Sequence, residues 1–414
     1  MSSEISIPLD LPDVQILGSR SEGAERLIVE IRSALTGTPC RRCGHHTEQF
    51  HGYDRTIQLQ HLPAFGREVK IEIRPKRYRC LHCEGAPTST QRCAWYEVNH
   101  PCTRAYEKWV MRLLAHSTVA DVSRVTGVGI KTIESIFQRY VDSEVDWERL
   151  SDLETLGIDE IALRKGHKAY KAVVFARDSA GANHALAVLA DRDQSTVEAF
   201  LKTIPDRLKA TVERVCIDLW AGYKTAVHRA LPEAAVVADR FHVARLYRDA
   251  VDEVRKRELR RLKAELPEEE AAPCKDAMWP LRRPWPSLRP DQQLQVAQVL
   301  NLSPTLKDAY GLREVLSAIF EATTDRATAA ERLDAWADEV KRLGASCFDT
   351  FLSTLKTWRE PILNYFDGRH SSGFVEGLNN KLKLLKRRCF GLEDPVELFR
   401  RFKLDLEGEA CWSS

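Results

Sequence analysis

The chain contains 414 residues, a length that predicts two to four compact units rather than one. Hydrophobic residues make up 43% and charged residues 29%, which excludes a mainly disordered or fibrous protein. The 62 Lys and Arg residues against 60 Asp and Glu leave a net charge of only +2, so global charge does not indicate a nucleic-acid partner. No apolar run approaches the roughly 18 residues that cross a bilayer, and no N-terminal signal pattern is present, so we expect no membrane partner.

The first hundred residues carry two Cys-x-x-Cys pairs among predicted strands. The alternation in "RLIVEIRS" and at Val69, Ile71 and Ile73 is typical of half-buried strands. Two such pairs can bind one tetrahedral Zn²⁺, provided that a hairpin brings them together across an unusually long intervening segment. We therefore predict a zinc-ribbon domain over residues 1–100 with one structural Zn²⁺. Its ligands would be Cys40, Cys43, Cys80 and Cys83.

Alternatives to this zinc site remain open. Two unrelated thiol pairs or a redox pair would show the same spacing, and His45, His46 or His82 could replace one ligand. Four thiolates leave no open coordination position, so the role would be structural and recognitional rather than catalytic. Basic residues flank both pairs, which favours a ribbon that faces DNA.

Residues 101–150 show the pattern of a helix-turn-helix. In "HSTVADVSRVTGVGIKTIESIFQRY", "TGVG" supplies the turn, and an ordinary helical hairpin would show the same pattern. The apolar positions expected to face inward are Val119, Val122, Val125, Ile130, Ile133, Phe137 and Tyr140. The outward residues of the second helix would enter a major groove, and the predicted DNA contacts among them are Lys131, Thr132, Gln138 and Arg139.

Residues 151–242 alternate between strand and helix patterns. The runs "LETLGIDEIAL", "YKAVVFARD" and "HALAVLADRD" predict three antiparallel strands, and a helix follows that we expect a capping box at Ser195 and Glu198 to open. Strand "VERVCID", helix "AGYKTAVHRAL" and strand "AAVVAD" complete the order β-β-β-α-β-α-β. This order predicts a ribonuclease H-like sheet, in which helical crossovers add parallel strands to the antiparallel ones.

Three acidic residues occupy positions where such a sheet gathers its chemistry. Asp159 lies inside the first strand, Asp218 closes the fourth, and Glu376 begins a later helix. A carboxylate within an apolar strand is costly to bury unless it is paired or bound to a cation. Together the three could hold two Mg²⁺ or Mn²⁺ ions for in-line phosphoryl transfer, although each alone could be a cap or a surface carboxylate.

Neighbouring residues compete for these roles. Glu160 should face the other side of its strand, so Asp159 and Glu160 cannot easily both be ligands. Asp239 ends the fifth strand and is the rival of Asp218. His242 follows it by three positions as a possible accessory contact near the metal edge, and it could equally be a structural histidine.

The remaining residues predict a large helical insertion, 243–366, and the end of the catalytic core, 367–414. Basic residues that follow Glu376 on one helix would hold the DNA backbone, namely Lys381, Lys383, Lys386, Arg387 and Arg388. A second basic run between Arg255 and Lys263 alternates with glutamates, so exposed ion pairs along a helix explain it equally well.

At these motifs the chain resembles the ISL-three group of bacterial insertion-sequence transposases. The resemblance covers nearly the whole chain and is carried by "LGIDEIALRKGHKAY", "CIDLWAGYKTAVHRALPEAAVVADRFHV" and "GFVEGLNNKLKLLKRRCFG". It implies a DDE transposase, with a ribonuclease H-like core interrupted by a helical insertion, in which Asp159, Asp218 and Glu376 match the catalytic acids. "DRFH" resembles an element of Mutator-like transposases, which favours Asp218 over Asp239 as the second acid.

The resemblance implies a function and its partners. We expect the N-terminal modules to bind the terminal inverted repeats of an insertion sequence, and the acids to support cleavage and strand transfer into target DNA. Two DNA ends make a homodimer or larger assembly the expected form, acting in the bacterial cytoplasm at the nucleoid. A DNA-binding regulator with a non-catalytic scaffold, or a nuclease that cuts without joining, are the alternatives.

Overall fold

The computed structural model describes residues 9, 11–163, 170–369, 373–390 and 392–412. Residues 164–169 and Gly391, which belong to the family motifs, and residues 370–372 before the helix of Glu376 lie outside the described residues. The chain divides into two compact units, Met1–Asp142 with Lys403–Ser414, and Ser143–Phe402. Among the described helices, none has both the length and the apolar character of a membrane span.

The first unit begins with a four-stranded sheet. Its strands are β1 (Val14–Glu22), β2 (Arg26–Ser33), β6 (Ile57–Ala64) and β7 (Arg67–Ile73), in the order β1-β2-β7-β6. Val69, Ile71 and Ile73 are all buried, as their alternation predicts. Strands β6 and β7 pair as an antiparallel hairpin, which confirms that a hairpin separates the two cysteine pairs.

Short strands flank both cysteine pairs. They are β3 (Thr38–Pro39), β4 (His46–Thr47), β5 (Phe50–Tyr53), β8 (Lys76–Arg79) and β9 (Thr88–Thr90). Strand β3 pairs with β4 around the first cysteine pair, and the second pair lies in the turn between β8 and β9. The backbone amide of Arg41 donates to the Ser89 hydroxyl at 3.0 Å, which links the turn of the first cysteine pair to β9.

Three helices form the predicted helix-turn-helix. They are α1 (Arg104–Ala115), α2 (Val119–Thr126) and α3 (Ile130–Tyr140). Thr118 and Asp121 form a capping box at the start of α2, and Gly127 ends this helix with a φ of 70°, a conformation that glycine adopts without strain. Gly127 therefore supplies the turn that the sequence predicts.

The core of these helices corrects two expected inward positions. Val125 and Ile130 are 72% and 49% exposed, whereas Ile136 is buried beside Ile133. Val125 and Ile130 flank the tight turn, where the chain lies at the surface of the helix pair rather than between the helices. Residues Leu404 and Trp412 also join this core, so the C-terminal segment completes the first unit.

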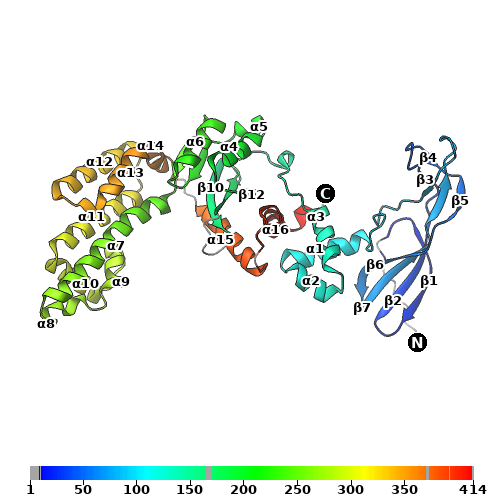
Figure 1. The fold of residues 1–414 in the computed structure, drawn as a ribbon, viewed down its shortest axis with the longest axis horizontal. Coiled ribbons are helices and arrows are strands. Elements are labelled where there is room, and N and C mark those ends of the chain that lie inside the picture. Colours follow the sequence, from blue (N-terminus) through cyan, green and yellow to red (C-terminus); the bar gives the residue numbers. More distant parts are fainter. Residues whose placement is uncertain (1–8, 10, 164–169, 370–372, 391, 413–414) are drawn as a thin grey trace. The chain divides into compact units, whose positions relative to one another are not determined.

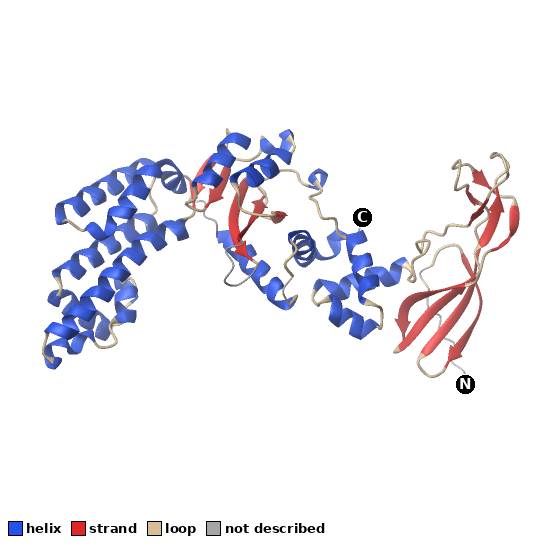
Figure 2. Ribbon diagram, in the orientation of Figure 1, coloured by secondary structure: helices blue, strands red, loops and turns tan. Residues whose placement is uncertain are grey.

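The second unit contains the predicted five-stranded sheet. Its strands are β10 (Thr155–Ala162), β11 (Tyr170–Arg177), β12 (Asn183–Val188), β13 (Arg214–Ile217) and β14 (Ala235–Ala238). The order is β12-β11-β10-β13-β14, with antiparallel pairing among the first three strands and parallel pairing of β10, β13 and β14. Figure 2 shows strands of this sheet in red with helices of the same unit beside them. The ribonuclease H-like order predicted from the sequence is confirmed.

Helices α4 (Gln194–Thr203), α5 (Asp206–Lys209) and α6 (Ala221–Ala230) connect these strands. The capping box expected at the start of α4 is wrong. Asp193 precedes the helix and makes no side-chain cap bond, so Ser195 already lies within the first turn. Glu198 instead accepts from Lys202 one turn further on, at 2.7 Å.

The helical insertion packs onto the sheet and shares its core. Its helices are α7 (Arg240–Glu265), α8 (Glu268–Ala271), α9 (Met278–Arg282), α10 (Pro290–Leu302), α11 (Pro304–Glu321), α12 (Arg326–Leu343), α13 (Asp349–Thr357) and α14 (Arg359–Leu363). Helix α7 starts at the sheet and runs into the insertion (Figure 1). Buried residues of the sheet and the insertion form one continuous cluster, so the insertion is part of the same folded unit.

Ion pairs along α7 account for much of its second basic run. Lys256 pairs with Glu253 at 2.6 Å, and Arg261 pairs with Glu265 at 2.7 Å. The chain then forms α15 (Gly373–Arg388) and α16 (Pro395–Glu407). Helix α15 packs against β10 and β11 and carries Glu376.

The domain ranges predicted from the sequence stay predictions. The two compact units differ from the last range, because Lys403–Ser414 groups with the N-terminal modules rather than with the catalytic core.

Candidate functional site

The four cysteines of the ribbon form a single cluster of sulfur atoms. The Cys40 and Cys83 sulfurs lie 4.0 Å apart, and those of Cys43 and Cys80 lie 3.7 Å apart. Four sulfurs bound at about 2.3 Å to a tetrahedral zinc ion would be about 3.8 Å from one another. The donor set and its spacing therefore fit a structural Zn²⁺. All four were predicted from the sequence, and the cluster contains no histidine.

Backbone amides prepare part of this cluster for a cation. The amides of Arg42 and Cys43 donate to the Cys40 sulfur and lower the pKa of that thiol to about 6. The neighbouring Cys43 thiol is the main cause that raises the pKa of Cys83 to about 12. The His45 and His82 rings stack on each other 4.7 Å apart, outside the sulfur cluster.

A second cluster of polar groups lies at one edge of the core sheet, and strand register explains why. Ile158 of β10 is the partner of Ile217 of β13, and Ile217 is the partner of Ala238 of β14. The next residue of each strand is an aspartate. Because parallel strands in register end at the same edge, Asp159, Asp218 and Asp239 come together there.

The edge borders a cleft of about 510 Å³. Helix α15 contributes one stripe to its wall, with residues three or four positions apart that share a face. The residues lining the cleft include Asp159, Asp218, Asp239, His242, Glu376, Asn379, Asn380 and Lys383. The three acids predicted from the sequence thus line the same cleft.

His242 bridges two of the aspartates. Its Nδ1 lies 2.9 Å from Asp218 Oδ1 and 3.0 Å from Asp239 Oδ2. The hydrogen bonds to these two carboxylates raise the pKa of His242 to about 10. Asp239 also caps α7 by accepting from the Phe241 backbone amide at 2.8 Å. His242 therefore holds the two carboxylates together.

Asn379 is a residue of the cleft that sequence reasoning missed. It is 1% exposed, and its Nδ2 donates to Asp159 Oδ2 at 2.5 Å and to the Glu160 carbonyl at 3.1 Å. Its Oδ1 has no hydrogen-bond partner among the described residues, although the atom is buried. The available signal was its spacing, three positions after Glu376 on one helix. Asn379 fixes the orientation of Asp159.

Gly157 allows α15 to approach the strand that carries Asp159. A Cβ atom at this position would lie 2.0 Å from Val375 Cγ2 and 3.3 Å from the Phe374 ring. Only a residue without a side chain is compatible with such a close approach. The glycine two positions before Asp159 thus determines how near Glu376 comes to the sheet edge.

The carboxylate oxygens of the three predicted acids do not all lie close enough to one another to form a single group of metal ligands. In the described part of the core, the ligand atoms that lie within 4.8 Å of one another belong to Asp218, Asp239 and His242. Asp159 and Glu376 line the cleft outside that group. The choice between Asp218 and Asp239 therefore stays open.

Glu160, next to Asp159 on β10, also lines the cleft, so its expected position on the other face of the strand stays a prediction. Its carboxylate accepts from Arg192 at 3.0 Å and from the Tyr223 hydroxyl of α6 at 3.4 Å. This pairing explains how a second carboxylate is accommodated next to Asp159.

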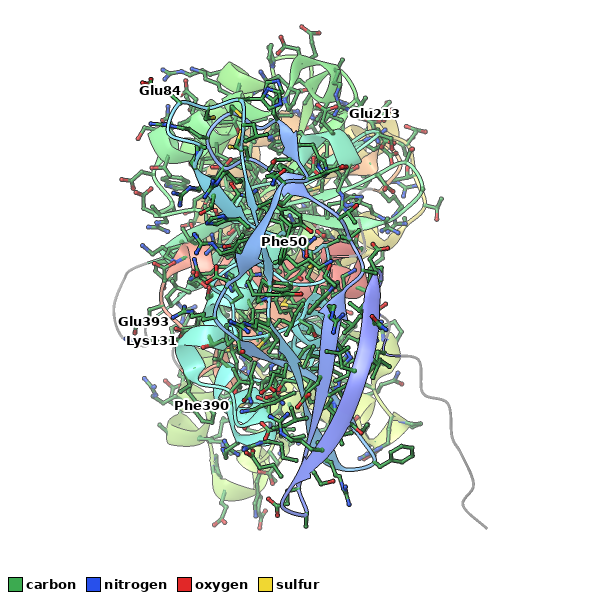
Figure 3. All side chains as sticks on the ribbon, turned by 90° about the vertical axis from the view of Figure 1, so that its right-hand side faces the viewer. Phe50, Glu84, Lys131, Glu213, Phe390 and Glu393 are labelled. Carbon is green, nitrogen blue, oxygen red and sulfur yellow. The ribbon has the colours of Figure 1, made fainter. Side chains whose placement is uncertain are left out.

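The predicted DNA-binding residues differ in their surroundings. On α15, Lys383 lines the cleft, whereas the Lys386 ammonium donates to the Ala162 carbonyl at 2.7 Å. Arg387 is exposed, and Lys381 and Arg388 are half-buried. Phe390, just beyond this helix, is 93% exposed (Figure 3).

On α3, Lys131 is exposed (Figure 3). Gln138 is also exposed, and Thr132 is half-buried. Arg139 instead reaches the buried Glu107 of α1, with Nη1 at 3.0 Å from both carboxylate oxygens. Its guanidinium therefore has a structural partner. None of these distances tests DNA contact, so the DNA-binding assignments stay predictions.

Three models of known protein families match this chain, each over a different part. A transposase family model, the DDE domain of the ISL3 group, matches residues 156–402. The helix-turn-helix domain of transposase family ISL3 matches residues 95–141, and the zinc finger of transposases IS204, IS1001, IS1096 and IS1165 matches residues 36–83. The chain belongs to the ISL3 family of transposases.

Named relatives of this transposase agree with the family. It is 28% identical to the transposase for insertion sequence element IS1001 of Bordetella parapertussis, over 90% of this chain and 89% of that protein. It is 25% identical to the transposase for insertion sequence element IS1557 of Mycobacterium tuberculosis, in strains CDC 1551 and H37Rv, over 96% of this chain and 92% of that protein. The resemblance read from the sequence is confirmed, as are the zinc-ribbon, helix-turn-helix and DDE assignments.

Proposed function

We propose that this transposase binds the terminal inverted repeats of its own insertion sequence, cleaves DNA at the element ends and joins the freed ends to target DNA. The observation that carries the proposal is the cleft at the sheet edge, where Asp159, Asp218 and Glu376 arrive from a strand, a strand end and a helix. A family match that extends from the zinc ribbon to α16 supports the DNA-binding part of the proposal.

The donor set of the cleft fits divalent cations. Carboxylate oxygens and an amide oxygen are the hard ligands that Mg²⁺ and Mn²⁺ prefer, and the buried Oδ1 of Asn379 is an acceptor without a partner among the described residues. We assign two such ions to Asp159, Asp218 and Glu376, with Asp239 as the rival of Asp218. When bound, a pair of ions lowers the pKa of the attacking hydroxyl and stabilises the leaving oxygen of the phosphodiester.

The protein's own residues position these groups. Asn379 holds Asp159 at the end of the sheet, and His242 holds Asp218 against Asp239. Lys383, one turn after Asn379 on the wall of the cleft, supplies a positive charge for the DNA backbone. The same site would serve cleavage and joining, because both reactions displace an oxygen from phosphorus.

Conservative substitutions of the acids test the proposal. We expect Asp218→Asn and Glu376→Gln to lower cleavage of a donor DNA that carries the gene's flanking sequences by at least about 100-fold, with end binding retained. Glu213→Gln is the matched control, because Glu213 precedes β13 at the end opposite to Asp218 and pairs with Arg214 at 2.8 Å.

The outcomes separate the alternatives. If Asp218→Asn cleaves normally and Asp239→Asn does not, Asp239 replaces Asp218 as the second ligand. Binding without cleavage or joining by the wild-type protein would favour a DNA-binding regulator, and cleavage without strand-transfer products would favour a nuclease.

A further inference from the structure

One face of α7 carries a continuous stripe away from the acidic cleft. Phe241, Arg245, Arg248, Asp252 and Arg255 follow one another at alternating spacings of four and three residues. Such spacings place all five on one side of a helix. At about 1.5 Å per residue, the stripe extends for about 21 Å. It begins two residues after Asp239, which caps the helix.

Two cavities meet on this stripe. Phe241 and Arg245 line the acidic cleft and also line a second cavity of about 210 Å³ within the same folded unit. The rest of the second cavity comes from further along α7 and from the insertion, including Leu281, Arg282 and Arg313. A ligand that extends from the cleft over Phe241 and Arg245 therefore reaches residues that also line the second cavity.

The second cavity has an excess of positive charge. Five arginines and two aspartates line it, and one of these arginines, Arg313, pairs with Glu314 at 2.8 Å, which still leaves more cations than carboxylates. Asp252 is the shared partner of Arg255 and Arg282, whose Nε atoms lie 2.8 and 3.0 Å from its Oδ1. Arg255 is only 6% exposed, and one carboxylate does not neutralise two guanidinium groups. The cavity is therefore suited to an anion.

Arg248 adds a cation without a partner of its own. It is exposed on the stripe, and it makes no hydrogen bond or ion pair within the part of the chain that the structure describes. A neighbouring arginine on the same face, Arg245, makes only a 3.4 Å contact with the exposed Asp249. Both side chains can turn toward a phosphate group at little cost.

An exposed aromatic ring lies at the junction of the two cavities. Phe241 is 55% exposed, and its ring meets His242 edge-on at 5.8 Å. Nucleobases stack readily on such rings, and they do so only after they have left the duplex, where both faces of each base are covered. A phenyl ring followed by arginines thus matches the alternation of base and phosphate in a single strand.

We propose that this stripe and the second cavity form a subsite for unpaired nucleotides of the DNA strand that leaves the acidic cleft. The base next to the cleft stacks on Phe241. The phosphates that follow it contact Arg245 and Arg248, and the pair of Arg255 and Arg282 closes the far end. This subsite rests on the proposed function, since it assumes that the cleft holds DNA.

The test compares two DNA probes on the full-length protein. One is a blunt duplex, and the other is the same duplex with a five-nucleotide thymidine overhang that carries one 2-aminopurine. Both are measured in the Glu376→Gln background, so that binding is read without cleavage. We expect the overhang to increase affinity and to quench 2-aminopurine fluorescence on binding.

Substitutions in the stripe test whether its residues cause the preference for the overhang probe. Phe241→Ala should weaken binding of the overhang probe by about 5- to 150-fold, the range for the loss of one base-stacking contact, and should weaken blunt-duplex binding less, so that the preference for the overhang is lost. Phe241→Trp should restore both affinity and quenching. Arg248→Ala should weaken binding of the overhang probe selectively, whereas Arg332→Ala, at a residue that is also exposed but lies on α12 outside the cavity, should not.

The result that overturns the subsite is an overhang preference that survives Phe241→Ala, or an equal loss for both probes in Arg248→Ala. The latter would place Arg248 on duplex backbone instead. Because no cleavage is measured, a selective effect of Phe241 would stand even if the acid substitutions failed to abolish transposition.

Discussion

At the scale of single residues, buried charges are held by partners that the sequence separates widely. Glu107 of α1 is 1% exposed and accepts from Arg139 and from the Tyr140 hydroxyl, each at 3.0 Å. In the same way, Asn379 donates a hydrogen bond to the Asp159 carboxylate although the two residues are 220 positions apart in the sequence. Such contacts are invisible in the local pattern, which is why Arg139 looked only like an outward residue of the second helix.

The Arg139 pair gives a test of its structural role. We expect Arg139→Ala to destabilise the helix-turn-helix by about 1–3 kcal/mol, because it leaves a buried carboxylate without its cation. Lys131→Ala, at an exposed position of the same helix, should leave thermal stability unchanged and reduce DNA binding alone. Equal melting temperatures for the two variants would show that Arg139 has no structural role, and would favour its original assignment as a DNA-binding residue.

At the scale of elements, the packing of α15 on β10 determines the shape of the catalytic cleft. We expect Gly157→Ala to cost about 1–3 kcal/mol and to lower cleavage, because the added methyl group forces α15 and Glu376 away from Asp159. Gly377→Ala is the matched control, since a Cβ there meets no atom within 4 Å. Chemical denaturation and donor cleavage measure the two effects, and an active, fully stable Gly157→Ala variant would contradict this account.

The folded structure of the zinc ribbon depends on its four thiols. We expect Cys80→Ser to lower bound zinc from one ion per chain and to weaken end binding, because a three-thiolate site loses affinity and the two cysteine turns separate. Cys347→Ser, a half-buried cysteine outside the cluster, should keep the full zinc content. Elemental analysis of the two purified variants decides, and unchanged zinc in Cys80→Ser would rule out the four-thiolate assignment.

At the scale of the whole molecule, each compact unit is completed by a distant part of the chain. The N-terminal unit takes Leu404 and Trp412 into the core of its three helices. The second unit takes α15 onto its sheet and buries the insertion in the core of the sheet. The insertion is therefore not a separately folded appendage.

The C-terminal contribution can be tested by one core substitution. Leu404 is fully buried, so Leu404→Ala should destabilise the helix-turn-helix unit by about 2–5 kcal/mol. In calorimetry, we expect one unfolding transition to shift to lower temperature while the transition of the second unit stays in place. A shift of both transitions, or of the second alone, would contradict the assignment of Leu404 to the first unit.

The sequence by itself determined the strand order of the core, the four-cysteine cluster and the helix-turn-helix. Each is encoded by local spacing, with a period of two in strands, a Cys-x-x-Cys turn, or a glycine between short helices. Tertiary structure alone decided that Asp218 and Asp239 share His242, that Asn379 orients Asp159, and that the end of the chain belongs to the first unit. These features depend on strand register and on helix packing between residues far apart in the chain, for which no single segment carries a signal.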